Sequence, residues 1–167
     1  MIVGENGAGK STLLKIILGL VYSTSGTITK NDLQIGYVPE KMTPPQFISI
    51  YDFLLVLNDL KNGKKEDIDY YLKYWLLDND KNKKIRELSK GMLQKVIITQ
   101  AFLGKPDALI FDEALNGLDQ DMQRKLLDLI KKEKKNKIII ITSHYQDYYK
   151  DVVDKTLLIK DGKIWEN

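Results

Sequence analysis

A glycine-rich stretch near the start of the chain has the residue types that bind phosphate groups. It fits the pattern G-x-x-x-x-G-K-[ST] and lies between the apolar runs 1–3 and 13–18. Its glycines permit backbone angles closed to other residues, so successive N–H groups can turn inward around phosphate oxygens at the positive end of a helix. Lys10 can reach the β- and γ-phosphates and the Ser11 hydroxyl can enter the shell of Mg²⁺, which predicts a nucleotide site. The stretch consists of Gly4, Glu5, Asn6, Gly7, Ala8, Gly9, Lys10, Ser11 and Thr12.

Carboxylates follow two other strand-like runs of the sequence. Asp112 and Glu113 come directly after the run 108–111, which is typical of a buried parallel strand. After a phosphate loop, such a pair allows one carboxylate to hold Mg²⁺ and the other to orient water. Glu40 follows the run 34–38 at the carboxyl edge, where open α/β sheets bind ligands, so we interpret it as a functional residue. An exposed loop residue is the alternative for Glu40.

Two further sites have weaker signals of their own. His144, the chain's single histidine, follows the run 138–141, which we expect to be a fully buried strand. A lone histidine is more often structural, but the same sheet edge would bring it beside the phosphate loop, so we interpret it as a site residue. Ser89 and Gly91 precede a run with apolar residues on one helical face, which makes Ser89 a candidate N-cap. A plain helix start is the alternative reading of this pair.

The elements that must position these residues alternate between strands and helices. The run 1–3 is expected to be a central strand, and helices are predicted near 10–19 and 122–135. Thr27–Thr29 has a composition typical of a short strand, and the turn Asp161-Gly162 predicts a closing hairpin. The sequence therefore predicts an α/β fold with a mainly parallel sheet flanked by helices.

The pattern of residue types along the chain changes after Pro44-Pro45. Helical periodicity replaces strand-like runs, which indicates an inserted α-helical subdomain at 43–105, with the core formed by 1–42 and 106–167. Four aromatic residues of this insert could form a binding surface, but packing between helices is the favoured interpretation. They are Tyr70, Tyr71, Tyr74 and Trp75.

Composition limits the classes of protein to which the chain can belong. Its 167 residues are 43% hydrophobic, which is enough for one core with room for a smaller attached lobe. The absence of cysteine excludes disulfides and thiolate metal sites. The chain has 26 basic and 23 acidic residues, so its net charge is nearly balanced and gives no case for a nucleic-acid partner. No apolar run approaches the roughly 20 residues of a membrane span, so work at a membrane would need a partner that supplies the span.

Taken together, these motifs resemble the nucleotide-binding ATPase subunit of ABC transporters, in that family's order and over nearly the whole chain. Gly4–Thr12 resembles the Walker A loop and 37–40 the Q-loop, while 88–92 resembles the signature motif. The range 109–113 resembles Walker B and 116–119 the D-loop, and His144 resembles the switch histidine. The resemblance implies a P-loop NTPase fold that binds ATP and Mg²⁺ and hydrolyses ATP to power transport.

The family's mechanism assigns a role to each of these positions. Ser11, Asp112 and Glu40 would hold Mg²⁺, Glu113 would polarise the attacking water, and His144 would contact the γ-phosphate. Ser89 and Gly91 would cap the nucleotide of a second subunit in a head-to-tail, ATP-dependent dimer. The resemblance also implies separate transmembrane subunits as partners, with this chain on the cytoplasmic face of the membrane.

The chain departs from the family pattern at several positions. Glu40 stands where glutamine is usual, and Lys90 and Met92 replace the commoner glycine and glutamine, which favours an exporter-type subgroup. Ala114-Leu115 stands where proline and threonine are usual. Only three residues precede Gly4, whereas the family places an adenine-stacking aromatic upstream, so we expect an N-terminally truncated portion that binds ATP weakly.

Two other functions stay open at this point. The chain could be a non-catalytic nucleotide-binding or regulatory module, because the adenine-stacking region is missing. Retention of Lys10, Asp112, Glu113 and His144 together argues against that reading. A soluble ATPase acting on DNA or ribosomes would carry a long coiled coil or a second ATPase domain, and this sequence has neither.

Overall fold

A six-stranded sheet forms the centre of the computed structural model, which describes residues 1–29, 32–144 and 146–166. The strand order is β2-β3-β4-β1-β5-β6, and every pairing is parallel except that of β5 with β6. The first strand of the chain is therefore central, as predicted. The strands are β1 (Ile2–Val3), β2 (Ile35–Val38), β3 (Ala108–Asp112), β4 (Ile138–Thr142), β5 (Leu157–Lys160) and β6 (Lys163–Glu166).

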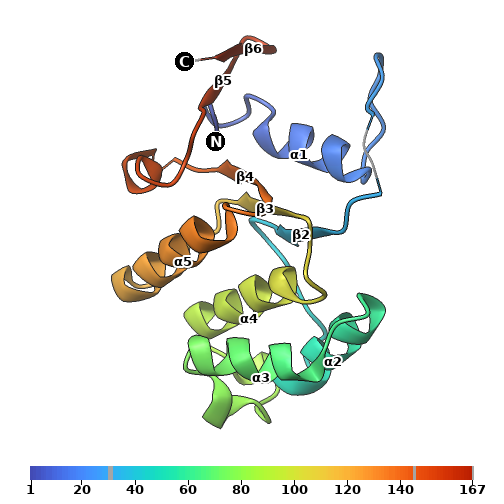
Figure 1. Cartoon of the computed structure of the whole chain (residues 1–167), viewed down its shortest axis with the longest axis vertical. Coiled ribbons are helices and arrows are strands. Elements are labelled where there is room, and N and C mark those ends of the chain that lie inside the picture. The colour runs from blue at the N-terminus through green and yellow to red at the C-terminus, as the bar shows by residue number, and fades with distance from the viewer. Residues whose placement is uncertain (30–31, 145, 167) are drawn as a thin grey trace.

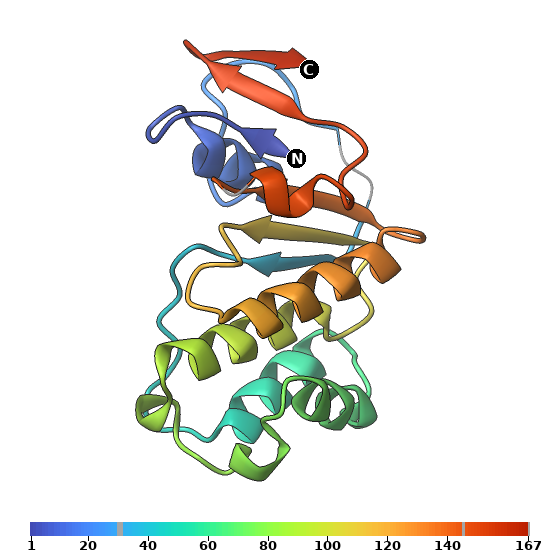
Figure 2. The ribbon, with the colours of Figure 1, turned by 90° about the vertical axis from the view of Figure 1, so that its left-hand side faces the viewer.

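Helices cover both faces of this sheet (Figure 1). Helix α1 packs on one face, where its Leu14 meets Ile110 of β3. Helices α4 and α5 lie against the other face, and α2 and α3 lie beyond α4 (Figure 2). The helices are α1 (Lys10–Leu18), α2 (Ile50–Leu60), α3 (Lys65–Tyr74), α4 (Lys90–Phe102) and α5 (Gln120–Glu133), with short 3₁₀ turns η1 (Asp78–Asp80), η2 (Ile85–Glu87) and η3 (Gln146–Tyr149).

Alternation along β3 explains why both faces of the sheet are apolar. Ile110 faces α1, whereas Leu109 and Phe111 join the larger core formed with the helices of the opposite face. Gly36 of β2 permits a close approach between the layers, because a Cβ at this position would overlap the backbone carbonyl of Ala101 in α4. The α/β fold with a mostly parallel sheet and flanking helices is thus confirmed.

The stretch between β2 and β3 is helical in the described structure. Trp75 and Leu72 of this stretch are buried in one continuous core with Val38 and Phe111 of the sheet. Trp75 is fully buried and Tyr71 packs on the ring of Phe102, so these two aromatics serve packing, as favoured above, whereas Tyr70 is half exposed. The boundaries of an inserted subdomain at 43–105 stay a prediction.

Two expectations about strands were wrong. Thr27–Thr29 forms no strand, because these exposed residues have no neighbouring strand in the described structure to complete their backbone hydrogen bonds. The strand β4 is not fully buried, since Ile138 is 56% exposed. Only Thr142 at the carboxyl end of β4 pairs with β1, through Ile2, so the earlier residues of β4 have a strand neighbour on one side only.

The closing hairpin is present. Strands β5 and β6 pair through the turn Asp161-Gly162, whose two residues both have positive φ, as a tight two-residue hairpin turn requires. Across the described residues, no helix is both long and apolar enough to cross a membrane.

Candidate nucleotide-binding site

The carboxyl ends of β1, β2, β3 and β4 bring the predicted site residues around one open cavity of about 350 Å³. The phosphate loop follows β1, Glu40 follows β2, Asp112-Glu113 ends β3, and His144 follows β4. Parallel strands direct their ends to the same edge, which explains why residues far apart in the sequence meet here. The cavity is lined by Asn6, Gly7, Gly9, Lys10, Ser11, Thr12, Glu40, Asp112, Glu113, Asn116 and His144.

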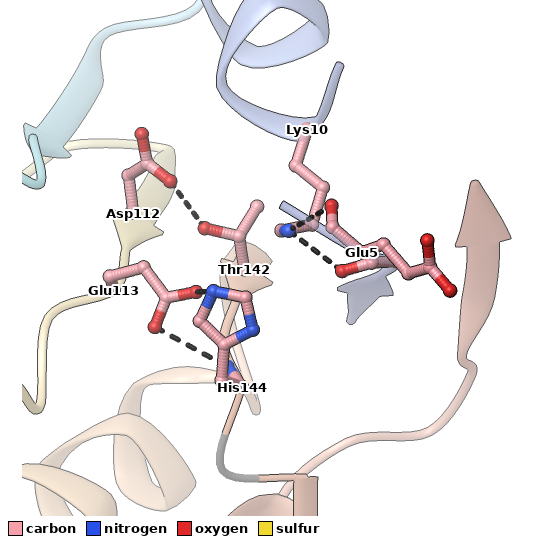
Figure 3. A network of polar contacts seen from close by, with 7 residues as sticks. Glu5, Lys10, Asp112, Glu113, Thr142 and His144 are labelled. Carbon is pink, nitrogen blue, oxygen red and sulfur yellow. Dashed lines mark hydrogen bonds and ion pairs between the residues drawn. The ribbon is translucent and has the colours of Figure 1, made fainter. Parts of the chain in front are cut away.

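The phosphate loop is folded around the side chain of its lysine (Figure 3). Lys10 is 8% exposed, and its Nζ donates to the carbonyl oxygens of Gly4 at 2.8 Å and Glu5 at 3.1 Å. Gly9 precedes α1 with φ 101°, and no side chain caps the first turn of this helix. The first N–H groups of α1 therefore have no side-chain acceptor and are available to an anion in the cavity.

Three residues of the loop do not line this cavity. Glu5 and Ala8 lie on the other side of the loop, where they line a second cavity with the β5–β6 turn. Gly4 touches β5 so closely that a Cβ would lie 2.5 Å from the carbonyl oxygen of Ile159. These residues shape the loop and fix it against the sheet.

The two carboxylates after β3 have different surroundings. Asp112 is 2% exposed and accepts a hydrogen bond from the hydroxyl of Thr142 on the adjacent β4. Glu113 is held by its neighbour His144: the two side chains approach to 3.2 Å between Oε1 and Nε2, and the His144 backbone N–H donates to Oε2 at 3.3 Å (Figure 3). Glu113 also has φ 52°, an uncommon conformation for this residue type, which ends the strand and turns its side chain into the site.

Two tyrosines near the carboxylates were missed by the sequence interpretation. Burial, together with the charge of Asp112 and a hydrogen bond to it, raises the pKa of Tyr37 to about 12, so this hydroxyl stays protonated at neutral pH. Burial and the charge of Glu113 raise the pKa of Tyr149, whose side chain is fully buried. Tyr37 lies on β2, three residues before Glu40, and this position near the carboxyl end of a strand was the signal that could have identified it.

The donor atoms in the cavity suit Mg²⁺. Ser11, Glu40 and Asp112 present oxygen atoms, which this hard cation prefers. Within the described ranges, no three acidic, histidine or cysteine side chains lie close enough to hold a metal ion by themselves. Mg²⁺ commonly binds through one or two carboxylates together with substrate phosphates, so these residues fit a metal that is held jointly with a nucleotide.

Ser89 and Gly91 lie away from this cavity. Ser89 is exposed and caps α4, since its hydroxyl accepts from the Met92 N–H at 3.2 Å. A Cβ on Gly91 would lie 3.2 Å from the carbonyl oxygen of Gly117, which follows the cavity residue Asn116. Residues 116 and 117 thus connect the cavity to the start of α4, but the two potential anion sites stay separate within one chain.

Comparisons with known proteins identify the family. Residues 1–116 match the family model described as ABC transporter. An uncharacterised ABC transporter ATP-binding protein of Methanocaldococcus jannaschii is 36% identical over 167 residues, which cover 97% of this chain and 63% of that protein. The zinc import ATP-binding protein ZnuC of Mannheimia succiniciproducens is 38% identical over 149 residues, which cover 86% of this chain and 55% of that protein.

Solved structures agree with this match. An ATP-binding subunit of an ABC transporter has a TM-score of 0.91 and 26% identity, covering 99% of this chain and 78% of that one. An ATP-binding cassette solved as a dimer after hydrolysis, with ADP and phosphate bound, has a TM-score of 0.84 and 25% identity, covering 99% of this chain and 83% of that one. Together with the family match over residues 1–116 of 167, these likenesses show that the chain belongs to the ABC transporter family, among its ATP-binding proteins.

Proposed function

We propose that the chain binds and hydrolyses ATP and thereby energises transport through separate transmembrane subunits. The observation that carries the proposal is the convergence of Lys10, Asp112, Glu113 and His144 on one cavity, from three different strand ends. A cation for phosphate, a buried carboxylate for metal and a second carboxylate paired with histidine are the parts that phosphoryl transfer needs. A non-catalytic module has no need of this complete set.

Binding of the phosphates begins with the loop and Lys10. The N–H groups of the first turn of α1 meet the phosphate oxygens, and the ammonium of Lys10 exchanges its present carbonyl partners for the β- and γ-phosphates. Ser11, Asp112 and Glu40 would hold Mg²⁺, which when bound neutralises phosphate charge. Thr12 adds a second hydroxyl to the same wall of the cavity.

Glu113 then serves as the group that orients and polarises the attacking water. Its Oε1 faces Nε2 of His144 at 3.2 Å. We expect His144 to turn to the γ-phosphate when nucleotide binds, which frees this oxygen of Glu113 for water. The backbone N–H of His144 can keep its contact with Oε2, so the carboxylate stays oriented.

Ser89 and Gly91 act, in this proposal, on the nucleotide of a second ATPase subunit. The exposure of Ser89, and the absence of both residues from the lining of their own chain's cavity, support a head-to-tail dimer in which each α4 faces the partner's phosphate loop. The dimeric cassette with ADP and phosphate supports dimerisation as a property of a related protein. Placement on the cytoplasmic face of the membrane follows from the same proposal.

The direction of transport is a finer proposal. Lys90, Met92 and Glu40 favour an exporter-type subgroup, whereas one similar protein is named for zinc import. Co-purification with a transmembrane protein, followed by transport assays in vesicles, distinguishes the two directions.

Phosphate release by the purified chain with Mg²⁺ and ATP tests the proposed activity. Glu113→Gln should lower the rate about 10²- to 10⁴-fold, the usual contribution of a positioned base, while ATP binding persists. Asp121→Asn is the matched control, because Asp121 lies exposed on α5 beside Arg124. Hydrolysis by Glu113→Gln at the parental rate would show that another group positions the water.

A further inference from the structure

Tyr37 lies on β2 at a position from which its side chain can reach the end of β3. The register places Tyr37 opposite Ile110, and both belong to the core on the α1 face of the sheet. Asp112 lies two residues after Ile110 on β3, so its side chain points to the same face. This placement brings the Tyr37 hydroxyl near the Asp112 carboxylate, whose charge and hydrogen bonding add to burial in raising the pKa of this tyrosine.

Hydroxyl groups of both neighbouring strands are therefore placed beside Asp112. Thr142 of β4 is its register partner on one side and donates through Oγ1. Tyr37 of β2 reaches it from the other side. Because Asp112 is almost completely buried and an ionised carboxylate only accepts hydrogen bonds, these two donors restrict the orientation of its oxygens.

The backbone of Tyr37 is itself held in place by the helical layer. Its carbonyl oxygen accepts a hydrogen bond from Nε2 of Gln100 in α4. The ammonium of Lys61, just after α2, donates in turn to the backbone carbonyl and to Oε1 of Gln100. Gly36, the preceding residue, touches the α4 backbone at Ala101, so β2 has little freedom to shift at this point.

We propose that Tyr37 is a positioning residue for the divalent metal: its hydroxyl holds the Asp112 carboxylate in the orientation that binds Mg²⁺ together with the nucleotide. The inference rests on the proposed function, because it concerns the metal of the same site. It assigns no contact between Tyr37 and the nucleotide. Loss of the hydroxyl should therefore weaken metal uptake and leave metal-free ATP binding unchanged.

Tyr37→Phe removes the hydroxyl and keeps the ring that packs in the core. Its matched control is Tyr74→Phe, since the Tyr74 hydroxyl donates to the Lys125 carbonyl oxygen at 2.8 Å, in contact with α5 rather than with the cavity. The primary measurement is uptake of Mn²⁺, a paramagnetic substitute for Mg²⁺, by the protein in the presence of ATP, followed by electron paramagnetic resonance. ATP affinity in EDTA and the unfolding midpoint of each variant are measured alongside.

For Tyr37→Phe we expect half-saturation at an Mn²⁺ concentration about tenfold higher than for the parental chain. Tenfold is the lower end of the loss in metal affinity that follows when a residue bonded to a metal ligand is removed. ATP affinity in EDTA should equal that of the parental chain, and excess Mg²⁺ should restore hydrolysis. Tyr74→Phe should match the parental chain in metal uptake.

Three results would overturn the proposal. Parental Mn²⁺ uptake by Tyr37→Phe would show that Thr142 alone suffices to orient Asp112. An equal loss of ATP affinity with and without metal would show a general effect on the cavity rather than on the metal. A parental chain that binds ATP but takes up no metal would overturn the metal site itself, whereas a failure confined to Tyr37→Phe leaves the proposed ATPase function standing.

Discussion

Helices α1 and α4 both begin where the proposed reaction needs to bind phosphate, but their first turns are built differently. Helix α1 follows Gly9, which has no side chain to offer, and its first turn faces a cavity that also contains Asp112 and Glu113. Helix α4 follows Ser89, whose hydroxyl already accepts from the Met92 N–H, and this start is exposed.

This difference indicates what completes each site. The N–H groups at the start of α1 lack a side-chain acceptor, so a bound phosphate supplies what the chain leaves out. The start of α4 is partly satisfied by its own cap and needs no ligand to be stable. In the proposed function, the first site is completed by the nucleotide and the second by a partner that brings its nucleotide, so substitutions at the two starts should have separable effects.

The largest effect is expected from Lys10→Ala. This substitution removes the cation at the start of α1 and its two bonds to the loop carbonyls, so ATP affinity and hydrolysis should each fall by about 100-fold or more. Isothermal titration with ATP measures the first and phosphate release the second. Lys15→Ala, in the last turn of the same helix, is the control and should bind ATP like the parental chain. Retained affinity in Lys10→Ala would contradict the site.

Ser89→Arg should separate dimerisation from binding. A bulky cation at the exposed start of α4 would occupy the partner's phosphate site, so the ATP-dependent dimer is lost while the monomer still binds ATP. Light scattering with and without ATP, in a Glu113→Gln background that retains nucleotide, measures the dimer. Ser49→Arg makes the same change at the N-cap of α2 and should leave dimerisation intact.

Mixing variants sharpens the comparison between the two starts. A Ser89→Arg chain still has its phosphate loop, and a Lys10→Ala chain still has its Ser89, so a head-to-tail pair can assemble one working site. Recovery of two working sites per pair, measured as nucleotide bound per dimer, would contradict this arrangement.

Much of this edge of the molecule could be predicted because its signals are local. Lys10 belongs to a glycine-rich stretch between two apolar runs, and Asp112-Glu113 directly follows a third. Parallel strands bring such positions to one edge. The contacts of Tyr37 and Thr142 with Asp112 could not be predicted, because they depend on which strands are neighbours and in what register. A single sequence contains the residue types but not that pairing.

The wrong strand predictions have the same cause. Thr27–Thr29 has strand-forming residues, yet strand formation needs a neighbour, and no described strand lies beside it. The apolar run of β4 suggested full burial, but its burial depends on how far β1 extends along it, which only the register reveals.

A smaller effect is expected from Ser89→Ala, which removes the cap without adding bulk. Loss of the bond to the Met92 N–H should lower the free energy of unfolding by about 1 kcal/mol, measured by urea denaturation. Ser49→Ala, at the equivalent position of α2, should cost a similar amount. Tripolyphosphate should stabilise the parental chain and Ser89→Ala equally, because it binds at α1. Ligand stabilisation that disappears in monomeric Ser89→Ala would mean that α4 binds the anion in its own chain.

The smallest effect concerns the far end of α4 and depends on pH. Burial lowers the pKa of Lys61 to about 8, while the amine donates to the Gln100 carbonyl near the last turn of this helix. Below pH 8 the amine is charged in both the folded and the unfolded chain, and the cost of burying the charge is fully present. Between about pH 8 and 10.5 the unfolded chain binds the additional proton, so stability rises with pH.

Lys61→Met, which cannot titrate, isolates this contribution. From pH 7 to pH 9.5 the parental chain should gain about 0.5–1 kcal/mol of unfolding free energy relative to Lys61→Met, a discounted value because water still reaches the half-buried side chain. Urea denaturation of both chains at several pH values measures this difference in unfolding free energy. Because the two chains share every other titratable group, the contributions of those groups cancel in the difference. Gln100 also donates to the backbone carbonyl of Tyr37. Measuring Mn²⁺ uptake by both chains over the same pH range would therefore show whether this end of α4 influences metal binding. Parallel stability curves for the two chains would mean that Lys61 keeps its ordinary pKa and that the end of α4 is insensitive to the charge beside it.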